Sequence, residues 1–183
     1  EDYYDQECSW WHTDERGEVY RNRIRKINGR SYAFDGIGRM QTGFVLFDGK
    51  SEFVARYEVD DWSSEDFIEG TIYGIEKSDL YLFSPDELND GSMQIGKDIA
   101  VELEDGVFHF GFASNGKAFG NRNRLQKKEG MYYINGLRLE ADEEYGYGVV
   151  KVEDGADAYY QVVDTRGKVI EGKKKIVKDK EGG

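Results

Sequence analysis

The sequence predicts an all-β protein, a solenoid-like array of β-hairpin repeats with short helical-turn insertions. Glycine is frequent, with 23 residues, whereas proline occurs once, a balance typical of tight turns between strands. Aromatic residues make up 14% of the chain, and flat rings suit short strands that bury them between layers. Short motifs also recur along the chain, which favours a repeat array over the alternative, a single sandwich or barrel.

The clearest hairpin unit covers residues 22–44. It holds two turn signals, Asn28-Gly29 and Asp35-Gly36, and such dipeptides supply the positive φ angles of tight hairpin turns. Tyr32 and Phe34 alternate with small residues, so one face of the expected strand is aromatic. A Gly-x-Met-x-x-Gly-aromatic segment over 38–44 closes the unit.

Pieces of this unit return downstream. Residues 22–26 match residues 123–127, and each copy reaches a glycine at the same distance, Gly29 and Gly130. The further copies are residues 93–96 for 40–43, residues 164–172 for 35–43, and a looser copy over 115–120. We therefore expect four or five degenerate hairpin units with uneven spacing.

These motifs resemble the cell-wall-binding, or choline-binding, repeats of Gram-positive surface proteins. The shared pattern is an aromatic strand, then Asp/Asn-x-x-Gly-Lys/Arg-Met, then Thr-Gly-aromatic. The match is good over residues 22–44, fair over 107–140 and 159–180, and poor over 48–80. The resemblance implies hairpins stacked into a β-solenoid, with ligands held between neighbouring hairpins in cages of aromatic residues.

The chain departs from that pattern at two positions. In choline-binding repeats a Trp usually stands before the tyrosine pair and another follows the Thr-Gly, where this chain has Ser31 and Phe44. Phe and Tyr attract cations less strongly than Trp does. We therefore expect the fold and a surface role to carry over, with a cell-wall polymer or glycan as the partner in preference to choline itself.

Residues 1–183 are predicted to form one β-hairpin repeat region, with hairpin repeats over 1–47, divergent or inserted hairpins over 48–90, and hairpin repeats over 91–183. Phe44–Phe47 forms a continuous apolar run, which predicts a strand buried on both faces. The chain begins without Met, and another unit begins near Lys173, so we expect a piece of a longer surface protein.

The divergent part carries helix signals. Ser63 followed by Asp66 predicts a short helix start, and residues 84–88 predict a one-turn helical insertion with proline at its first position. Between them we expect strands over 71–73 and 80–83, because β-branched and aromatic residues predominate there.

The composition limits which binding partners and which cellular compartment are expected. A net charge of -12 argues against binding nucleic acid or an anionic bilayer. The basic run Lys173–Lys175 is interpreted as a solvated strand edge, with contact to a polyanion as the alternative. Cys8 is the only cysteine, which fits a secreted Gram-positive or a cytosolic protein. With the resemblance, this indicates an extracellular, cell-wall-associated protein without membrane insertion.

No catalytic or metal motif appears. His12 and His109 are far apart and lack metal-ligand spacing, and neither a nucleophile elbow nor a phosphate-binding glycine loop is present. The acidic residues over 58–66 lack the spacing of a calcium loop. We therefore predict a non-catalytic protein with no cofactor and no metal site.

The candidate ligand-binding residues are aromatic, because a ring face can stack on a sugar or hold a quaternary ammonium group. Neighbouring strand residues point to opposite faces, so one member of the Trp10-Trp11 pair is expected in the core and the other exposed. The predicted ligand-binding residues are Trp10, Trp11, Tyr32, Phe44, Tyr132, Tyr133 and Tyr160. The alternatives are that Phe44 and Tyr32 are core residues, and that the whole chain is a spacer or a protein-interaction scaffold with no small ligand.

Overall fold

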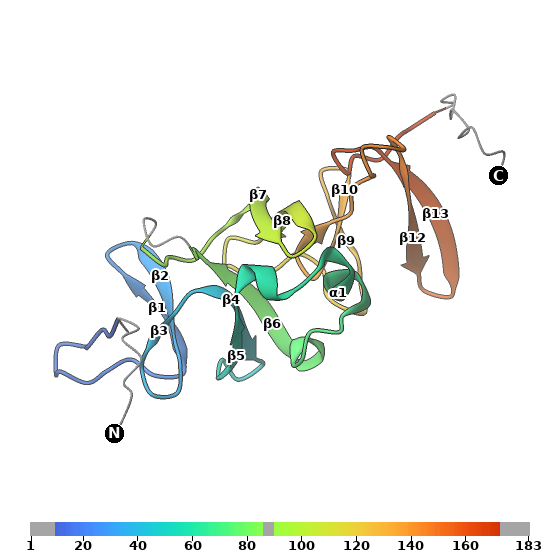
Figure 1. The fold of residues 1–183 in the computed structure, drawn as a ribbon. Coiled ribbons are helices and arrows are strands. Elements are labelled where there is room, and N and C mark those ends of the chain that lie inside the picture. The colour runs from blue at the N-terminus through green and yellow to red at the C-terminus, as the bar shows by residue number, and fades with distance from the viewer. Residues whose placement is uncertain (1–9, 86–89, 173–183) are drawn as a thin grey trace, which may run out of the picture.

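The computed structural model describes residues 10–85 and 90–172, and it shows an elongated row of small antiparallel sheets (Figure 1). The strands are β1 (Arg23–Ile27), β2 (Arg30–Phe34), β3 (Met40–Gln41), β4 (Gly43–Asp48), β5 (Phe53–Tyr57), β6 (Ser78–Phe83), β7 (Gly96–Leu103), β8 (Gly106–Phe112), β9 (Gln126–Lys128), β10 (Met131–Ile134), β11 (Leu137–Arg138), β12 (Gly148–Asp154) and β13 (Asp157–Val163). They form four sheets, ordered β1-β2-β3, β5-β4-β6, β7-β8-β11-β10-β9 and β12-β13. The prediction of an all-β array of hairpins is confirmed.

Two-residue turns join several of these strands. Asn28-Gly29 between β1 and β2 has φ angles of 48° and 88°, and Asn135-Gly136 between β10 and β11 has 48° and 84°. Both residues of each turn are therefore left-handed, as a type I′ hairpin turn requires. Gly130 closes the β9–β10 hairpin in the same way, with a φ of 83°, so the predicted correspondence with Gly29 is confirmed.

The predicted turn at Asp35-Gly36 is confirmed, since the Gly38 N–H donates to the Asp35 carbonyl over 3.1 Å, but the two-residue form with a positive φ at Gly36 was wrong. Gly36 is absent from the positive-φ residues, and Gly38 has a φ of 94° in its place. The turn is a five-residue loop from Asp35 to Arg39, in which the Asp35 N–H donates to the Arg39 carbonyl over 3.0 Å. The side chain of Asp35 explains the longer loop, because it accepts hydrogen bonds that a two-residue turn could not present to it.

This five-residue loop occurs five times in the described residues, counting the copy at Asp35. In every copy the first N–H donates to the fifth carbonyl and the fourth N–H donates to the first carbonyl, over 2.8 to 3.1 Å, and the fourth residue has a positive φ. The copies begin at Asp14, Asp35, Asp48, Ala113 and Asp164. The residues flanking each loop pair as Thr13–Val19, Phe34–Met40, Phe47–Phe53, Phe112–Ala118 and Val163–Val169. The copy predicted at 164–172 and the looser one around 115–120 are confirmed, and the loop at Asp48 is a further copy within the divergent part.

An aspartate closes four of the five loops. One carboxylate oxygen accepts the N–H groups of the third and fifth loop residues: Ile37 and Arg39 for Asp35, over 3.0 and 2.9 Å. The same pair of bonds is made by Asp14, Asp48 and Asp164. These bonds satisfy loop donors that have no strand partner.

The main core lies around the central strand β4. Phe44 packs against Phe67 and Phe110, with ring centroids 5.1 and 5.3 Å apart, whereas Val45 and Phe47 pack on the opposite face in a second cluster. Because each face of β4 is covered by a different layer, the predicted burial of Phe44–Phe47 on both faces is confirmed.

One helix covers the β4 sheet. α1 (Ser64–Glu69) begins at the predicted cap Ser63, where the Asp66 carboxylate accepts the Ser63 N–H and hydroxyl over 3.0 and 2.8 Å. The predicted strand over 71–73 was wrong. A turn stands there, followed by the 3-10 helix η2 (Ile75–Lys77), because Ile72 and Ile75 both fill the core that α1 leaves open.

Other predictions have separate outcomes. The predicted strand over 80–83 is confirmed as part of β6, and η1 (Val59–Asp61) precedes α1. β12 begins at Gly148, directly after a turn in which Gly146 takes a positive φ of 69°. The helical insertion expected over 84–88 falls largely outside the described residues, as do Cys8 and Lys173–Lys175.

We predict that Asp35→Ala destabilises the protein more than Asp14→Ala. The buried Asp35 carboxylate accepts four hydrogen bonds, two of them from the Arg39 and Gln41 side chains, whereas the half-buried Asp14 accepts two. Leaving N–H donors without a hydrogen-bond partner lowers the free energy of unfolding by about 3 kcal/mol in the first variant and about 1 kcal/mol in the second. Urea unfolding measures both, and equal losses would contradict this account of the loop.

We predict that Asp66→Asn lowers stability by about 1 to 2 kcal/mol at neutral pH, because hydrogen bonds to a charged acceptor are lost. The Thr71 hydroxyl, 2.6 Å away, and Ser63 lower the pKa of Asp66. The stabilisation is therefore present above the unfolded pKa near 3.8 and is lost as pH falls through the lower folded pKa. The variant should lose less stability on acidification than the parent and a Glu65→Gln control, as measured by melting temperature between pH 7 and pH 2.

Candidate functional site

The two adjacent tryptophans lie at the edge of the first sheet. Trp10 accepts a backbone hydrogen bond from Met40 over 2.9 Å, and Trp11 pairs with Arg39, so residues 10–13 extend the sheet beyond β3. The expectation that one of them is a core residue was wrong, since Trp10 is 71% and Trp11 48% exposed. An edge segment has only one neighbouring strand to cover its side chains.

Trp10 and Trp11 present their rings on opposite faces of this edge. Trp10 stands opposite Met40, and Trp11 opposite Arg39, and directly opposed side chains on antiparallel strands are neighbours. The Arg39 guanidinium is held by Asp35 through an Nε–Oδ2 contact of 3.0 Å. Trp11 thus offers a ring face beside a positioned hydrogen-bond donor, the combination that a sugar hydroxyl and its CH face require.

Two stacked aromatic rings lie near this edge. The Asp14 loop folds Tyr20 back onto His12, whose rings stack with centroids 5.5 Å apart at 15°, and Tyr20 also contacts Phe34 at 5.7 Å. The Arg25 guanidinium carbon lies 5.3 Å from the Tyr20 ring centroid. We call Trp10, Trp11, His12 and Tyr20 the N-terminal aromatic surface.

Sequence inspection missed His12 and Tyr20 as partners. No known spacing links two aromatic residues eight apart. The available signal was the five-residue Asp14 loop, which pairs Thr13 with Val19 and so places the flanking residues side by side.

Three of the predicted ligand-binding residues are buried. Phe44 and Tyr133 are 1% and 0% exposed, and Tyr132 is 3% exposed. The Tyr133 hydroxyl donates to the Lys97 carbonyl over 2.7 Å, and burial raises its pKa. The Tyr132 hydroxyl donates to Gln161 on β13. These rings hold sheets together and do not present a face to solvent.

Tyr32 and Tyr160 have different surroundings. Tyr32 is half-buried, and its hydroxyl donates to Asp90 over 3.0 Å. Tyr160 is 68% exposed on β13 opposite Lys151, at the other end of the molecule from the first hairpin (Figure 1). Trp10 and Trp11 therefore share one sheet edge with their rings on opposite faces, whereas Tyr160 stands apart from both.

The recurring loop puts these residues in register. Trp10, Ser31, Phe44, His109 and Tyr160 each stand four residues before the first residue of a loop copy. Ser31 is the position that the family resemblance assigns to the first Trp. The same position is exposed at both ends of the chain, and buried at Phe44, where α1 and β8 cover it.

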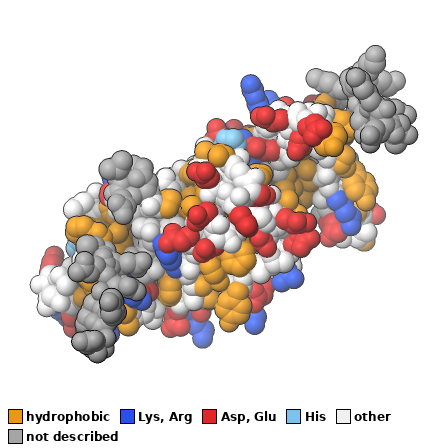
Figure 2. Space-filling view, in the orientation of Figure 1, with side chains coloured by type: hydrophobic (Ala, Val, Ile, Leu, Met, Phe, Trp, Pro, Cys, Tyr) orange, Lys and Arg blue, Asp and Glu red, His pale blue; other side chains and the backbone are white. Residues whose placement is uncertain are grey.

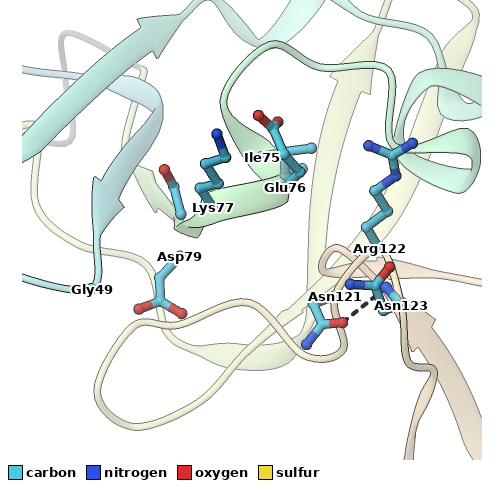
Figure 3. A pocket seen from close by; sticks show the side chains of 9 residues that line it. Gly49, Ile75, Glu76, Lys77, Asp79, Asn121, Arg122 and Asn123 are labelled. Carbon is cyan, nitrogen blue, oxygen red and sulfur yellow. Dashed lines mark hydrogen bonds between the residues drawn. The ribbon is translucent and has the colours of Figure 1, made fainter.

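A polar hollow of about 300 Å³ lies between the Gly49 loop, η2 and residues 121–123 (Figure 3). Its lining mixes the acidic Glu76 and Asp79 with the basic Lys77 and Arg122. Asp79 is paired with Lys117 at 2.7 Å. No aromatic ring lines this hollow, so it offers no stacking surface.

In the part of the chain that the structure describes, no group of three or more His, Cys, Asp or Glu residues is placed to hold a metal ion. Within the same residues, none of the helices has the length and apolar character needed to cross a membrane.

Among known proteins, the matches to this chain are solved structures with a similar fold. No protein-family model and no curated protein sequence matches the chain. The chain is similar in fold to choline-binding repeat proteins. Choline binding protein F of Streptococcus pneumoniae, solved with a peptidoglycan analogue, is 16% identical with a TM-score of 0.45, over 88% of this chain and 38% of its own.

Two further structures have the same character. CbpJ from Streptococcus pneumoniae is 14% identical with a TM-score of 0.46, over 90% of this chain and 60% of its own. The cell-wall endolysin from phage Cp-1, complexed with choline, is 15% identical with a TM-score of 0.36, over all of this chain and 43% of its own. This chain thus spans 38% to 60% of their lengths, and what it binds has to follow from its own side chains.

We predict that Phe44→Ala and Trp10→Ala differ sharply in their effect on stability. Removing the buried Phe44 ring leaves a cavity between α1 and β8 and costs about 3 to 5 kcal/mol. Removing the exposed Trp10 ring costs within about 0.5 kcal/mol. Thermal unfolding of both variants measures this, and a large loss in Trp10→Ala would show that its ring is structural.

Proposed function

We propose that this chain is a non-catalytic binding module for a cell-wall polymer or surface glycan, and that it attaches a secreted bacterial protein to the cell envelope. The observation that carries the proposal is the exposure of Trp10 and Trp11 side by side on one sheet edge. Two large exposed indoles in the described part of a chain with a mean hydropathy of -0.75 are costly to display without a ligand.

The N-terminal aromatic surface suits a ligand with an apolar face and a polar rim. The Trp11 ring stacks on the CH face of a sugar, and the neighbouring Arg39 donates hydrogen bonds to its hydroxyls. For a cationic group each ring contributes roughly 0.5 to 2 kcal/mol, so useful affinity needs two or three rings. Trp10 and Trp11 lie on opposite faces of the edge, and a choline cage needs rings that converge, so a glycan that passes along the edge fits better than choline.

A spacer or protein-interaction scaffold is the second candidate function. It is favoured by the two ends of the array, where aromatic residues are exposed far from each other, at Trp10 and at Tyr160. In that case the tryptophans would serve a protein contact, and soluble sugars would leave them unaffected.

We predict that Trp11→Ala and Trp10→Ala each weaken binding to purified Gram-positive cell wall about tenfold or more, since one stacked ring contributes up to about 2 kcal/mol. Tyr160→Ala, which removes an equally exposed ring at the far end, is the matched control and should bind like the parent. Sedimentation of the protein with insoluble wall measures the bound fraction.

The nature of the ligand is resolved by fluorescence in a Trp62→Phe background. The Trp62 indole N–H is buried without a hydrogen-bond partner in the described structure, so the ring can be replaced at small cost, and Trp10 and Trp11 become the reporters. A saturable change with an N-acetylglucosamine tetrasaccharide but not with choline is expected. No change with either ligand, together with wall binding that survives both alanine variants, would leave the scaffold function.

A further inference from the structure

The first hairpin is strongly basic in an acidic protein. Residues 19–34 contain five Lys or Arg and no Asp or Glu. Residues 10–44 hold seven basic residues against four acidic ones, whereas residues 45–172 hold thirteen against twenty-seven. Acidic side chains are interspersed with other types over the middle of the molecule on the face shown in Figure 2. Residues 19–34 are thus a local concentration of positive charge in an acidic chain.

The five cations form one exposed group, the basic hairpin: Arg21, Arg23, Arg25, Lys26 and Arg30. All are exposed, and three of them lie on β1, which is the edge strand of its sheet. Within the described residues, Arg30 is the one with a carboxylate partner, Asp90, and Arg25 covers the Tyr20 ring. The remaining charges are not neutralised by a described acidic side chain, which leaves them available to an anion.

A groove opens beside the basic hairpin. Its volume is about 570 Å³, and it lies between the β1–β2 turn and residues 92–95. Its polar lining consists of Lys26, Arg30, Ser31, Ser92, Gln94 and Ser114. The Met93 N–H donates to the Ser31 carbonyl over 2.8 Å and joins the two walls. None of its lining residues is acidic, in contrast to the hollow in Figure 3.

This lining has the chemistry of a phosphate site. Lys and Arg side chains bind phosphate through charge-assisted hydrogen bonds, and serine hydroxyls donate to the remaining oxygens. Arg23 and Arg25 follow along the edge about 6.6 Å apart, so that further anionic groups of one polymer meet further cations.

We propose that the groove and the basic hairpin bind phosphate groups of a phosphate-bearing polymer. The proposal goes beyond glycan binding at the tryptophans and does not depend on it. Lys26 pairs with Ser31 on one face of the hairpin, whereas Arg25 pairs with Tyr32 on the other. The Lys26 side of the groove is therefore separate from the stack in which Arg25 covers Tyr20, whereas Arg30, two residues before Tyr32, lies on the Arg25 face.

The test uses poly(glycerol phosphate) as the probe, with Lys26→Gln and Lys26→Gln/Arg30→Gln as variants. The single variant breaks no described ion pair, and the exposed Arg30–Asp90 pair contributes little to stability, so both should melt like the parent. We expect about a tenfold loss of affinity in the double variant and a smaller loss in the single one. In the parent, affinity should fall linearly on a plot of log affinity against log salt concentration.

The matched control is Lys50→Gln/Arg166→Gln, which removes the same charge from two exposed loop positions. An equal loss in this control would overturn the site, since net charge alone would then govern binding. Competition by millimolar inorganic phosphate supports a phosphate site and shows that the polymer backbone adds little. Equal binding of polygalacturonate, a carboxylate polymer, or tighter binding of duplex DNA would overturn the assignment to a phosphate-bearing polymer. Trp11→Ala should leave the binding of poly(glycerol phosphate) unchanged. Failure of the phosphate-site proposal can therefore be distinguished from failure of the glycan-binding proposal.

Discussion

The aspartate that closes four of the five five-residue loops is the interaction on which most of the repeat architecture depends. A five-residue connection leaves two N–H groups pointing into the loop, and a single carboxylate oxygen accepts both at Asp14, Asp35, Asp48 and Asp164. The loop then sets the pairing of the flanking residues, because its first and fifth residues are joined by a backbone hydrogen bond. Register in each hairpin follows from this local chemistry and not from the chain as a whole.

The loops define units, but apolar burial joins them. β4 contributes side chains to both layers of the core. Val45 and Phe47 pack in the layer shared with the first hairpin, and Phe44 and Leu46 pack in the layer shared with α1 and β8. Gly43 allows this arrangement, because a Cβ there would lie 2.4 Å from the Tyr57 carbonyl oxygen. The glycine before Phe44 is thus a requirement of close packing, independent of any ligand.

Much of the fold could be predicted from sequence because its determinants are local. Asn28-Gly29, Ser63 with Asp66, and the apolar run Phe44–Phe47 each specify their own structure through turn, cap or burial chemistry. One error arose from a local bond that a dipeptide rule does not include: the Asp35 carboxylate accepts the Ile37 and Arg39 N–H groups and lengthens the turn. Another arose where distant contacts decide, since Ile72 is drawn into a core built by other segments. The exposure of Trp10 and Trp11 was equally unpredictable, since it depends on which described strands pair with their edge.

The candidate sites follow from the same distinction. One position, four residues before each loop copy, carries Trp, Ser, Phe, His and Tyr in the five copies. Its backbone setting is constant, so its surroundings decide its exposure. No described segment covers it at Trp10 and Tyr160, α1 and β8 cover it at Phe44, and it lines a hydrophilic groove at Ser31. That groove contains no ring and is lined by Lys26 and Arg30, so this copy presents charge where others present a ring. A repeat array can therefore change the side chain and surroundings of one position copy by copy while the loops keep the backbone unchanged.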